Sequence, residues 1–155
     1  MSAIVIDGAS LLAQVEGGLT LTDAERALEH EGLTLGLDGA PMGLTFADWL
    51  GAGAPGARPP WLDPADHLIA GIDATLPNGD VLSLRPAPRR AVGPDLVALF
   101  FGTHGRFGKV ERAWIRVHPR EGGRAAPHVF EAPATPPINA EAKLFDAIAK
   151  ELGTK

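Results

Sequence analysis

With 155 residues, of which 45% are hydrophobic, the chain is long enough to bury a sizeable core, so we expect one globular domain. A net charge of -5 without a basic stripe argues against nucleic acid or a membrane surface as a partner, and the absence of cysteine excludes disulfides, thiolate metal ligands and cysteine nucleophiles. The sequence has neither an apolar run long enough to span a bilayer nor a signal-peptide pattern, so we expect a cytoplasmic protein.

The N-terminal part of the chain predicts a β-hairpin followed by a helix. Short strands are expected over Ile4–Ile6 and Leu11–Val15, because an Asp-Gly turn signal separates two apolar runs. The pair Thr22 and Glu25 matches a capping box, which predicts an amphipathic helix from this point to a glycine stop at Gly32. The chain therefore opens with a strand pair and a helix of two to three turns.

The middle of the chain predicts a second helix and a second hairpin. Thr45 and Asp48 have the spacing of another helix start, and a short helix is expected to run through Leu50 into a Gly- and Pro-rich loop. Apolar residues alternate over Leu68–Leu76, and a Pro-Asn-Gly-Asp turn then leads into Val81–Leu84. This second segment is the clearest hairpin in the sequence.

A short helix, a glycine series and a strand follow. A proline at the first turn and Gly102 just past the end predict a helix over Asp95–Phe101. Gly105 and Gly108 continue a Gly-x-x-Gly-x-x-Gly series, which is typical of a main chain that approaches another group closely. From there to Val117, small or branched apolar residues alternate with arginine and tryptophan, which predicts a half-buried strand.

The C-terminal part predicts an arm and a final helix. The stretch from Pro119 to Pro137 is rich in proline, glycine and alanine, which is typical of a linker or a wrapping arm. Asn139 can cap a helix whose apolar face is formed by Leu144, Phe145, Ile148 and Leu152. We therefore expect a globular part at 1–119, a linker or arm at 120–138 and a helix at 139–153.

The order of these elements resembles the FAD-binding domain of the FAD-linked oxidases, the vanillyl-alcohol-oxidase or PCMH-type flavoproteins. The segments that carry the resemblance are Leu12–Leu21, Leu33–Gly36, Thr45–Gly56, Ala70–Gly79 and Gly93–Pro119. The resemblance covers only the second lobe of that domain, since these 155 residues contain no counterpart of the pyrophosphate-binding lobe or of the substrate cap domain. It implies an α+β fold, with a small antiparallel sheet of about five strands flanked by helices.

The resemblance also implies a component of an FAD-linked oxidoreductase, in which a partner lobe completes a weak or partial FAD site. Main chain from two segments would then contact the flavin, and no catalytic residue or metal ligand is assigned. The residues implied as cofactor contacts are Thr45, Gly51, Gly53, Gly56, Gly102, Gly105, Gly108, Lys109 and Val110.

Two features keep a second interpretation open, in which the chain is a degenerate homologue that binds no flavin and acts as an interaction or self-associating module. Ala47 and Asp48 replace the family's Gly-Gly pair, and we expect the Asp48 carboxylate to satisfy N–H groups of its own helix and to repel a phosphate. The glycine series is equally consistent with tight packing alone. His104, within this series, is either a proton-transfer group or a turn residue.

The remaining candidates are weaker. Asp63, Asp66 and His67 match no metal-ligand spacing, and the serines lack the sequence context of a hydrolase nucleophile. For partners, we expect either a homodimer in which the last helix takes part or a chain that carries the missing FAD-binding lobe.

Overall fold

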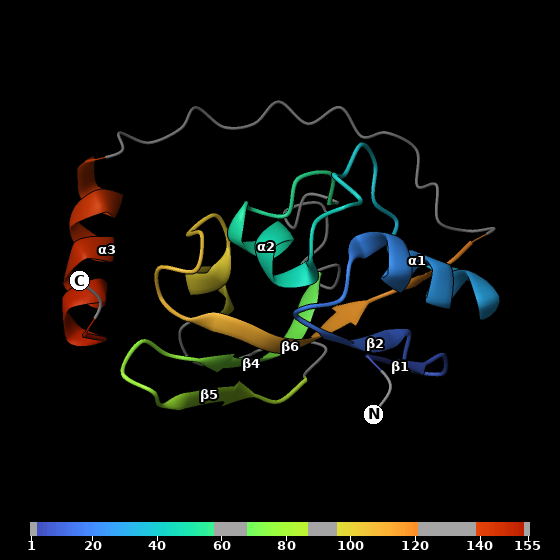
Figure 1. The fold of residues 1–155 in the computed structure, drawn as a ribbon, viewed down its shortest axis with the longest axis horizontal. Helices are drawn as coiled ribbons and strands as arrows, with labels where there is room; N and C mark the ends of the chain where they lie inside the picture. Colours follow the sequence, from blue (N-terminus) through green and yellow to red (C-terminus); the bar gives the residue numbers. More distant parts are fainter. Residues whose placement is uncertain (1–2, 58–67, 87–95, 121–138, 154–155) are drawn as a thin grey trace.

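A five-stranded antiparallel sheet with helices on one face forms the body of the protein, in a computed structural model that describes residues 3–57, 68–86, 96–120 and 139–153 (Figure 1). The strand order is β1-β2-β6-β4-β5, and each neighbouring pair is antiparallel. The strands are β1 (Ile4–Asp7), β2 (Leu12–Glu16), β4 (Ile69–Thr75), β5 (Val81–Leu84) and β6 (Lys109–Arg116). This arrangement confirms the predicted α+β class and both predicted hairpins.

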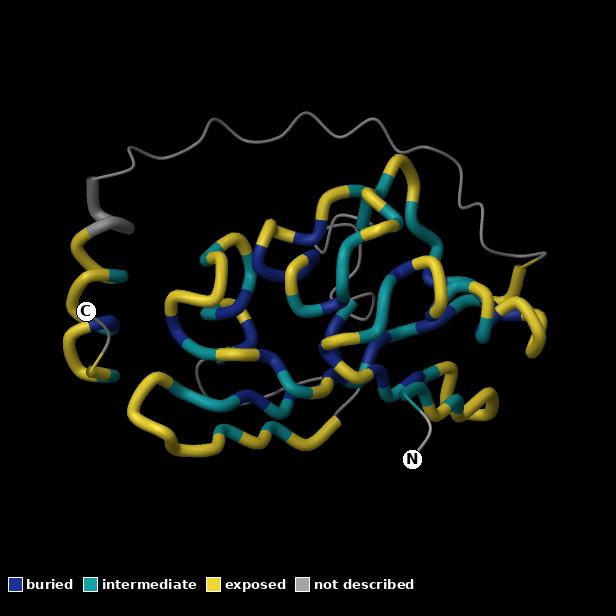
Figure 2. The backbone as a smooth tube through the Cα atoms, in the orientation of Figure 1, coloured by how far each residue is buried: buried dark blue, intermediate teal, exposed yellow. Residues whose placement is uncertain are grey.

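Within the described residues, the other elements are three α-helices, a 3₁₀ helix and a small second sheet. Figure 1 shows α1, α2 and the 3₁₀ helix η2 on the same side of the five-stranded sheet, and Figure 2 shows burial concentrated between them and the strands. In contrast, α3 stands at one end and is mostly exposed. The bounds are α1 (Leu21–His30), α2 (Phe46–Gly51), η2 (Leu96–Phe100), α3 (Asn139–Glu151), and β3 (Leu33–Thr34) paired with β7 (His118–Pro119).

The central strand is β6, which pairs with β2 on one side and β4 on the other. Its side chains alternate as predicted: Ala113 and Ile115 are fully buried, whereas Arg112 is exposed and Trp114 is half-buried. Because successive side chains of a strand point to opposite faces, this pattern places the small and branched residues against the helices.

The start of α1 corrects the predicted capping box. The N-cap is Thr20, not Thr22: the Asp23 N–H donates to the Thr20 hydroxyl oxygen at 3.1 Å, and that hydroxyl donates to the Asp23 carboxylate at 2.8 Å. The Thr22 hydroxyl instead donates to the Met42 carbonyl oxygen at 2.9 Å, and the Glu25 carboxylate accepts hydrogen bonds from the β3 region. Thr22 and Glu25, the predicted capping box, therefore make tertiary contacts and do not cap α1.

Two further predictions are corrected in detail. The predicted helix at Asp95–Phe101 is a 3₁₀ helix over its described part, and it buries Val97 and Phe100. Such tight helices occur in short pieces, and a glycine with φ of 68° turns the chain away directly after Phe101. In α3, Leu144 is 59% exposed and does not belong to the covered face. The other three predicted residues, Phe145, Ile148 and Leu152, are half-buried and accompany the buried Ala149.

Several predictions lie outside the described residues. These are most of the linker 120–138 and the loop that contains Asp63, Asp66 and His67. The domain boundaries therefore stay predictions. In the four described ranges, no helix is long and apolar enough to cross a membrane, and no three metal-ligating side chains come together.

The turn between β1 and β2 is held by Asp7. Its carboxylate accepts the N–H groups of Ala9 and Ser10, each at 3.1 Å. Hydrogen bonds from the Ser10 side chain and backbone, and then from Ala9, hold the pKa of Asp7 below its usual value. Because the ionised Asp7 carboxylate holds the turn, it contributes fully to folding stability at pH values above its unfolded-state pKa. This contribution is lost as the pH falls through the lower folded-state pKa.

Gly17, which follows β2, lies closer to β6 than a residue with a side chain could. A Cβ placed on it would lie 2.1 Å from the Val110 carbonyl oxygen and 3.3 Å from the Ala47 Cβ. The Gly17 N–H donates to the Glu111 carbonyl oxygen at 2.8 Å, and the Gly17 carbonyl accepts the Ala47 N–H at 2.9 Å. One residue therefore joins β2, β6 and α2.

We expect Gly17→Ala to lower the free energy of unfolding by about 3 kcal/mol, because the new methyl group overlaps backbone atoms that cannot move independently. Gly18→Ala is the matched control: nothing lies within 4 Å of a Cβ at this exposed neighbour, so the change should stay within about 0.5 kcal/mol. Urea denaturation of the three proteins tests this, and equal midpoints for Gly17→Ala and the parent would contradict it.

Candidate cofactor site

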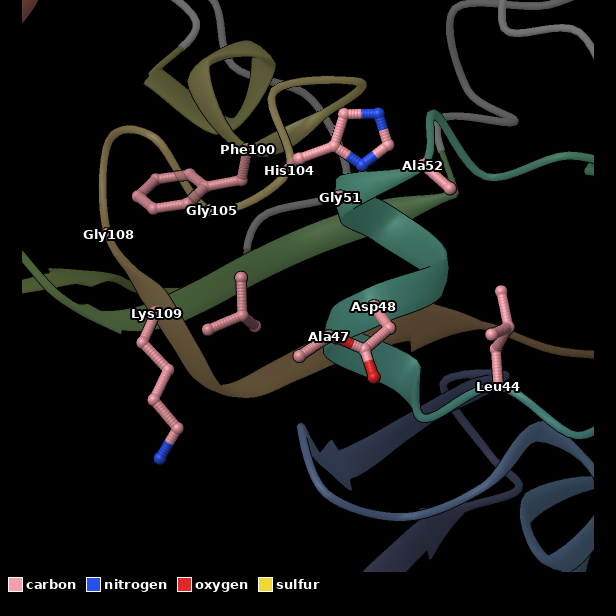
Figure 3. A pocket seen from close by; sticks show the side chains of 11 residues that line it. Leu44, Ala47, Asp48, Gly51, Ala52, Phe100, His104, Gly105, Gly108 and Lys109 are labelled. Atoms are coloured by element: carbon pink, nitrogen blue, oxygen red, sulfur yellow. The ribbon is translucent and has the colours of Figure 1, made fainter.

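A pocket of about 360 Å³ lies between α2 and the loop of residues 101–108 that leads into β6 (Figure 3). This volume is at the lower end of the range found for small-molecule sites. Its walls come from α2 and the residues beside it, from η2, from the loop and from the start of β6. The lining residues are Leu44, Ala47, Asp48, Gly51, Ala52, Phe100, His104, Gly105, Gly108, Lys109 and Val110.

The loop is attached to the end of α2 through main-chain hydrogen bonds. The Gly102 N–H donates to the Leu50 carbonyl oxygen at 3.1 Å, and the His104 N–H donates to the Gly51 carbonyl oxygen at 3.0 Å. A Cβ on Gly51 would lie 3.3 Å from the His104 Cα, a tighter approach than most side chains accept. The absence of a side chain at Gly51 therefore lets the 101–108 loop contact the end of α2 directly.

The backbone of the loop is left-handed at several positions. Gly102 and Gly105 have φ of 68° and 76°, and Gly108 has φ of 145°. A Cβ on Gly108 would lie 2.5 Å from the Thr75 carbonyl oxygen, so packing against β4 alone requires glycine there. His104 has φ of 49° without being glycine, and such residues are uncommon and concentrate at functional sites.

The structure brings together five of the nine residues that the sequence singled out as cofactor contacts, because Gly51, Gly105, Gly108, Lys109 and Val110 all line the pocket. Thr45, Gly53, Gly56 and Gly102 are not among its lining residues.

The four other positions have structural roles outside the pocket lining. Gly56, for example, faces another loop, where an added Cβ would lie 2.5 Å from the Asp38 carbonyl oxygen. Gly53 and Gly102 face each other, and a Cβ on Gly53 would lie 3.7 Å from the Gly102 Cα. Thr45 is the N-cap of α2. Cofactor contact stays a prediction for all nine residues.

The N-terminus of α2 has its donors occupied by the protein. The Phe46 N–H donates to the Leu19 carbonyl oxygen at 2.8 Å, and the Ala47 N–H is bound by Gly17. The Asp48 N–H donates to the Thr45 hydroxyl oxygen at 3.2 Å, and that hydroxyl donates to the Asp48 carboxylate at 2.7 Å. The expectation that the Asp48 carboxylate satisfies the helix N–H groups is thus corrected: Thr45 does so, and Asp48 orients Thr45.

Two apolar side chains that the sequence did not single out, together with His104, Asp48 and Lys109, give the pocket its character. Leu44 and Phe100 add apolar walls, and Phe100 is only 2% exposed. Figure 3 shows the His104 ring beside the end of α2, and Asp48 and Lys109 at the opposite side. The Lys109 ammonium is 3.1 Å from the Glu111 carboxylate. The arrangement suits a largely apolar group with a few polar atoms at its rim.

Comparison with known proteins finds relatives among the FAD-linked oxidoreductases. An uncharacterized FAD-linked oxidoreductase of Mycobacterium tuberculosis is 30% identical over 118 residues, which cover 74% of this chain and 25% of the relative. Glycolate oxidase subunit GlcD of Bacillus subtilis is 29% identical over 117 residues, again 74% of this chain and 25% of the relative. No family model matches the chain.

Among solved structures, an alkyldihydroxyacetonephosphate synthase superposes with a TM-score of 0.59 at 21% identity, over 74% of this chain and 20% of that chain. The fold is therefore the FAD-binding fold of the PCMH type, present as a partial domain. The chain is a homologue of the FAD-linked oxidoreductases, which confirms the resemblance seen in the sequence, and it spans 25% of the length of the curated relatives named above.

The cap of α2 gives a test of the site's framework. Thr45→Ala removes the acceptor for the Asp48 N–H and should lower the free energy of unfolding by about 1 kcal/mol. Thr45→Ser keeps the hydroxyl and should lose less than half of that amount. Thermal and urea unfolding of both variants provide the measurement, and equal losses would show that the methyl group of Thr45, and not its hydroxyl, stabilises α2.

Proposed function

We propose that this chain supplies one wall of a flavin site in an FAD-linked oxidoreductase, and that a second lobe completes the site. The observation that supports the proposal is the pocket between α2 and the 101–108 loop, formed by glycine-containing segments in a homologue of such enzymes. Flavin supplies hydride and electron transfer when it is bound. In this chain, Phe100 and Val110 would exclude water from its ring system.

The pocket fits one part of FAD better than another. Its largely apolar lining, which includes Leu44, Phe100 and Val110, suits a planar ring. A diphosphate fits the beginning of α2 poorly, because the N–H groups of its first three residues are already bound and the Asp48 carboxylate would repel it. The diphosphate would therefore have to be held by a lobe outside these residues.

The second candidate is a degenerate homologue that binds no flavin and serves as an interaction or self-associating module. The specific observation in its favour is the reciprocal hydrogen bonding of Thr45 and Asp48, which satisfies the start of α2 internally. Under this proposal the glycines of the 101–108 loop serve packing alone, as Gly108 against Thr75 illustrates.

Both candidates require a partner surface. In the first, the partner is a chain or segment that carries the diphosphate-binding lobe; in the second, it is a second copy of this chain. We propose either assembly because the lobe that normally covers this fold in the family has no counterpart in these 155 residues. Light scattering of the purified chain, with and without the candidate lobe, separates them.

The first functional test is flavin binding by the chain alone. We expect it to purify colourless and to bind FAD with a dissociation constant weaker than about 10 μM, because only one wall of the site is present. Fluorescence titration with FAD gives the value. Stoichiometric FAD retained through purification would contradict the requirement for a second lobe.

The second test separates the ring from the diphosphate. Asp48→Asn should raise the affinity for FAD about threefold to tenfold, because it removes a negative charge near the expected path of the diphosphate. The affinity for riboflavin, which carries no phosphate, should change less than about twofold. Glu31→Gln, which neutralises an exposed carboxylate at the C-cap of α1, is the charge-matched control.

The outcomes of this titration decide between the candidates. A gain for FAD alone supports the flavin site and identifies Asp48 as one cause of weak binding, in addition to the missing second lobe. Equal changes for FAD and riboflavin remove Asp48 as a barrier to the diphosphate. Absence of binding for both ligands in all three proteins, and also when the candidate lobe is added, favours the flavin-free module.

A further inference from the structure

The far side of the pocket loop carries a second small hydrophobic contact. Phe107 is only 1% exposed, although it does not belong to the main core between the helices and the sheet. Its ring centroid is 5.8 Å from that of Phe145 on α3, and α3 also buries Ala149 to 4% exposure. The final helix therefore covers an aromatic side chain of the loop.

A charged pair accompanies the aromatic contact. The Arg106 guanidinium lies 2.7 Å from the Asp146 carboxylate on α3 and 5.9 Å from the centroid of the Phe107 ring. Both side chains of the pair are about half or more exposed, at 49% and 69%. Exposed pairs contribute little to stability, so we attribute most of the contact energy between loop and helix to the tilted Phe107 and Phe145 rings.

The same loop forms the pocket on its other side. Gly102 and His104 are bound through their N–H groups to the end of α2, while His104, Gly105 and Gly108 line the pocket. The loop is thus held by α2 along one side and by α3 along the other. Between these two attachments, His104 stays in its left-handed conformation, which is unfavourable for a residue with a side chain.

We propose that α3 positions the pocket wall: by covering Phe107 it keeps the 101–108 loop in the conformation that lines the pocket. Phe107 and Phe145 are positioning residues in this arrangement, and neither lines the pocket. These contacts are present in the chain without a ligand, so the role of α3 can be tested without flavin. The arrangement also gives the C-terminal helix a role in site formation.

Hydrogen–deuterium exchange of the full chain tests the proposal. Phe145→Ala should release α3 and increase the exchange rate of the Gly102 and His104 amides about tenfold. Leu144→Ala, at an exposed position on the same helix, should leave these rates unchanged. Exchange in β2 and β6 serves as the internal reference, because α3 contributes nothing to the pairing of these strands.

Two more variants complete the design. Phe145→Leu keeps an apolar side chain against Phe107 and should restore at least half of the lost protection, whereas Asp146→Asn should change it less than about twofold. Exchange that rises equally in the loop and in the reference strands would show general destabilisation and overturn the proposal. Loop exchange in Phe145→Ala equal to that of the parent would overturn it as well.

Discussion

The close approach of Gly17 to β6 is the constraint on which the rest of the structure depends. Its N–H and carbonyl connect β6 with α2, and the space that a Cβ would need is filled by Val110 and Ala47. Both residues line the pocket, Ala47 from α2 and Val110 from β6. The distance between α2 and the sheet, and so the shape of the pocket floor, is therefore determined by a residue that the pocket does not contain.

The fold could be predicted from the sequence where the signals were local. Both hairpins and the alternation in β6 follow from side-chain periodicity and turn residues, and the structure has them where expected. The cap of α1 was misplaced because Thr20 and Thr22 each have an acidic residue three positions later, and only the distant Met42 carbonyl decides between them. For η2, the flanking proline and glycine indicated a helix but could not distinguish an α-helix from the tighter 3₁₀ form.

The site was predictable in one respect only. The family resemblance and the glycine series pointed to Gly51, Gly105, Gly108, Lys109 and Val110, all of which line the pocket. The apolar walls could not be found in this way, because Leu44 and Phe100 come from segments that are joined only by the fold. Gly17 was overlooked for the same reason: its requirement for glycine is visible only when the Val110 carbonyl is known to lie beside it.

The position of β6 has a consequence for the order of folding. β1 and β2 form one hairpin and β4 and β5 another, but each reaches the rest of the sheet only through β6. Its pairing with β2 joins residues about a hundred positions apart, Leu12 with Arg116, and such distant contacts slow folding. During synthesis, neither hairpin can complete its sheet before β6 has left the ribosome. Both hairpins, β1–β2 and β4–β5, therefore keep an unpaired strand edge until β6 is available.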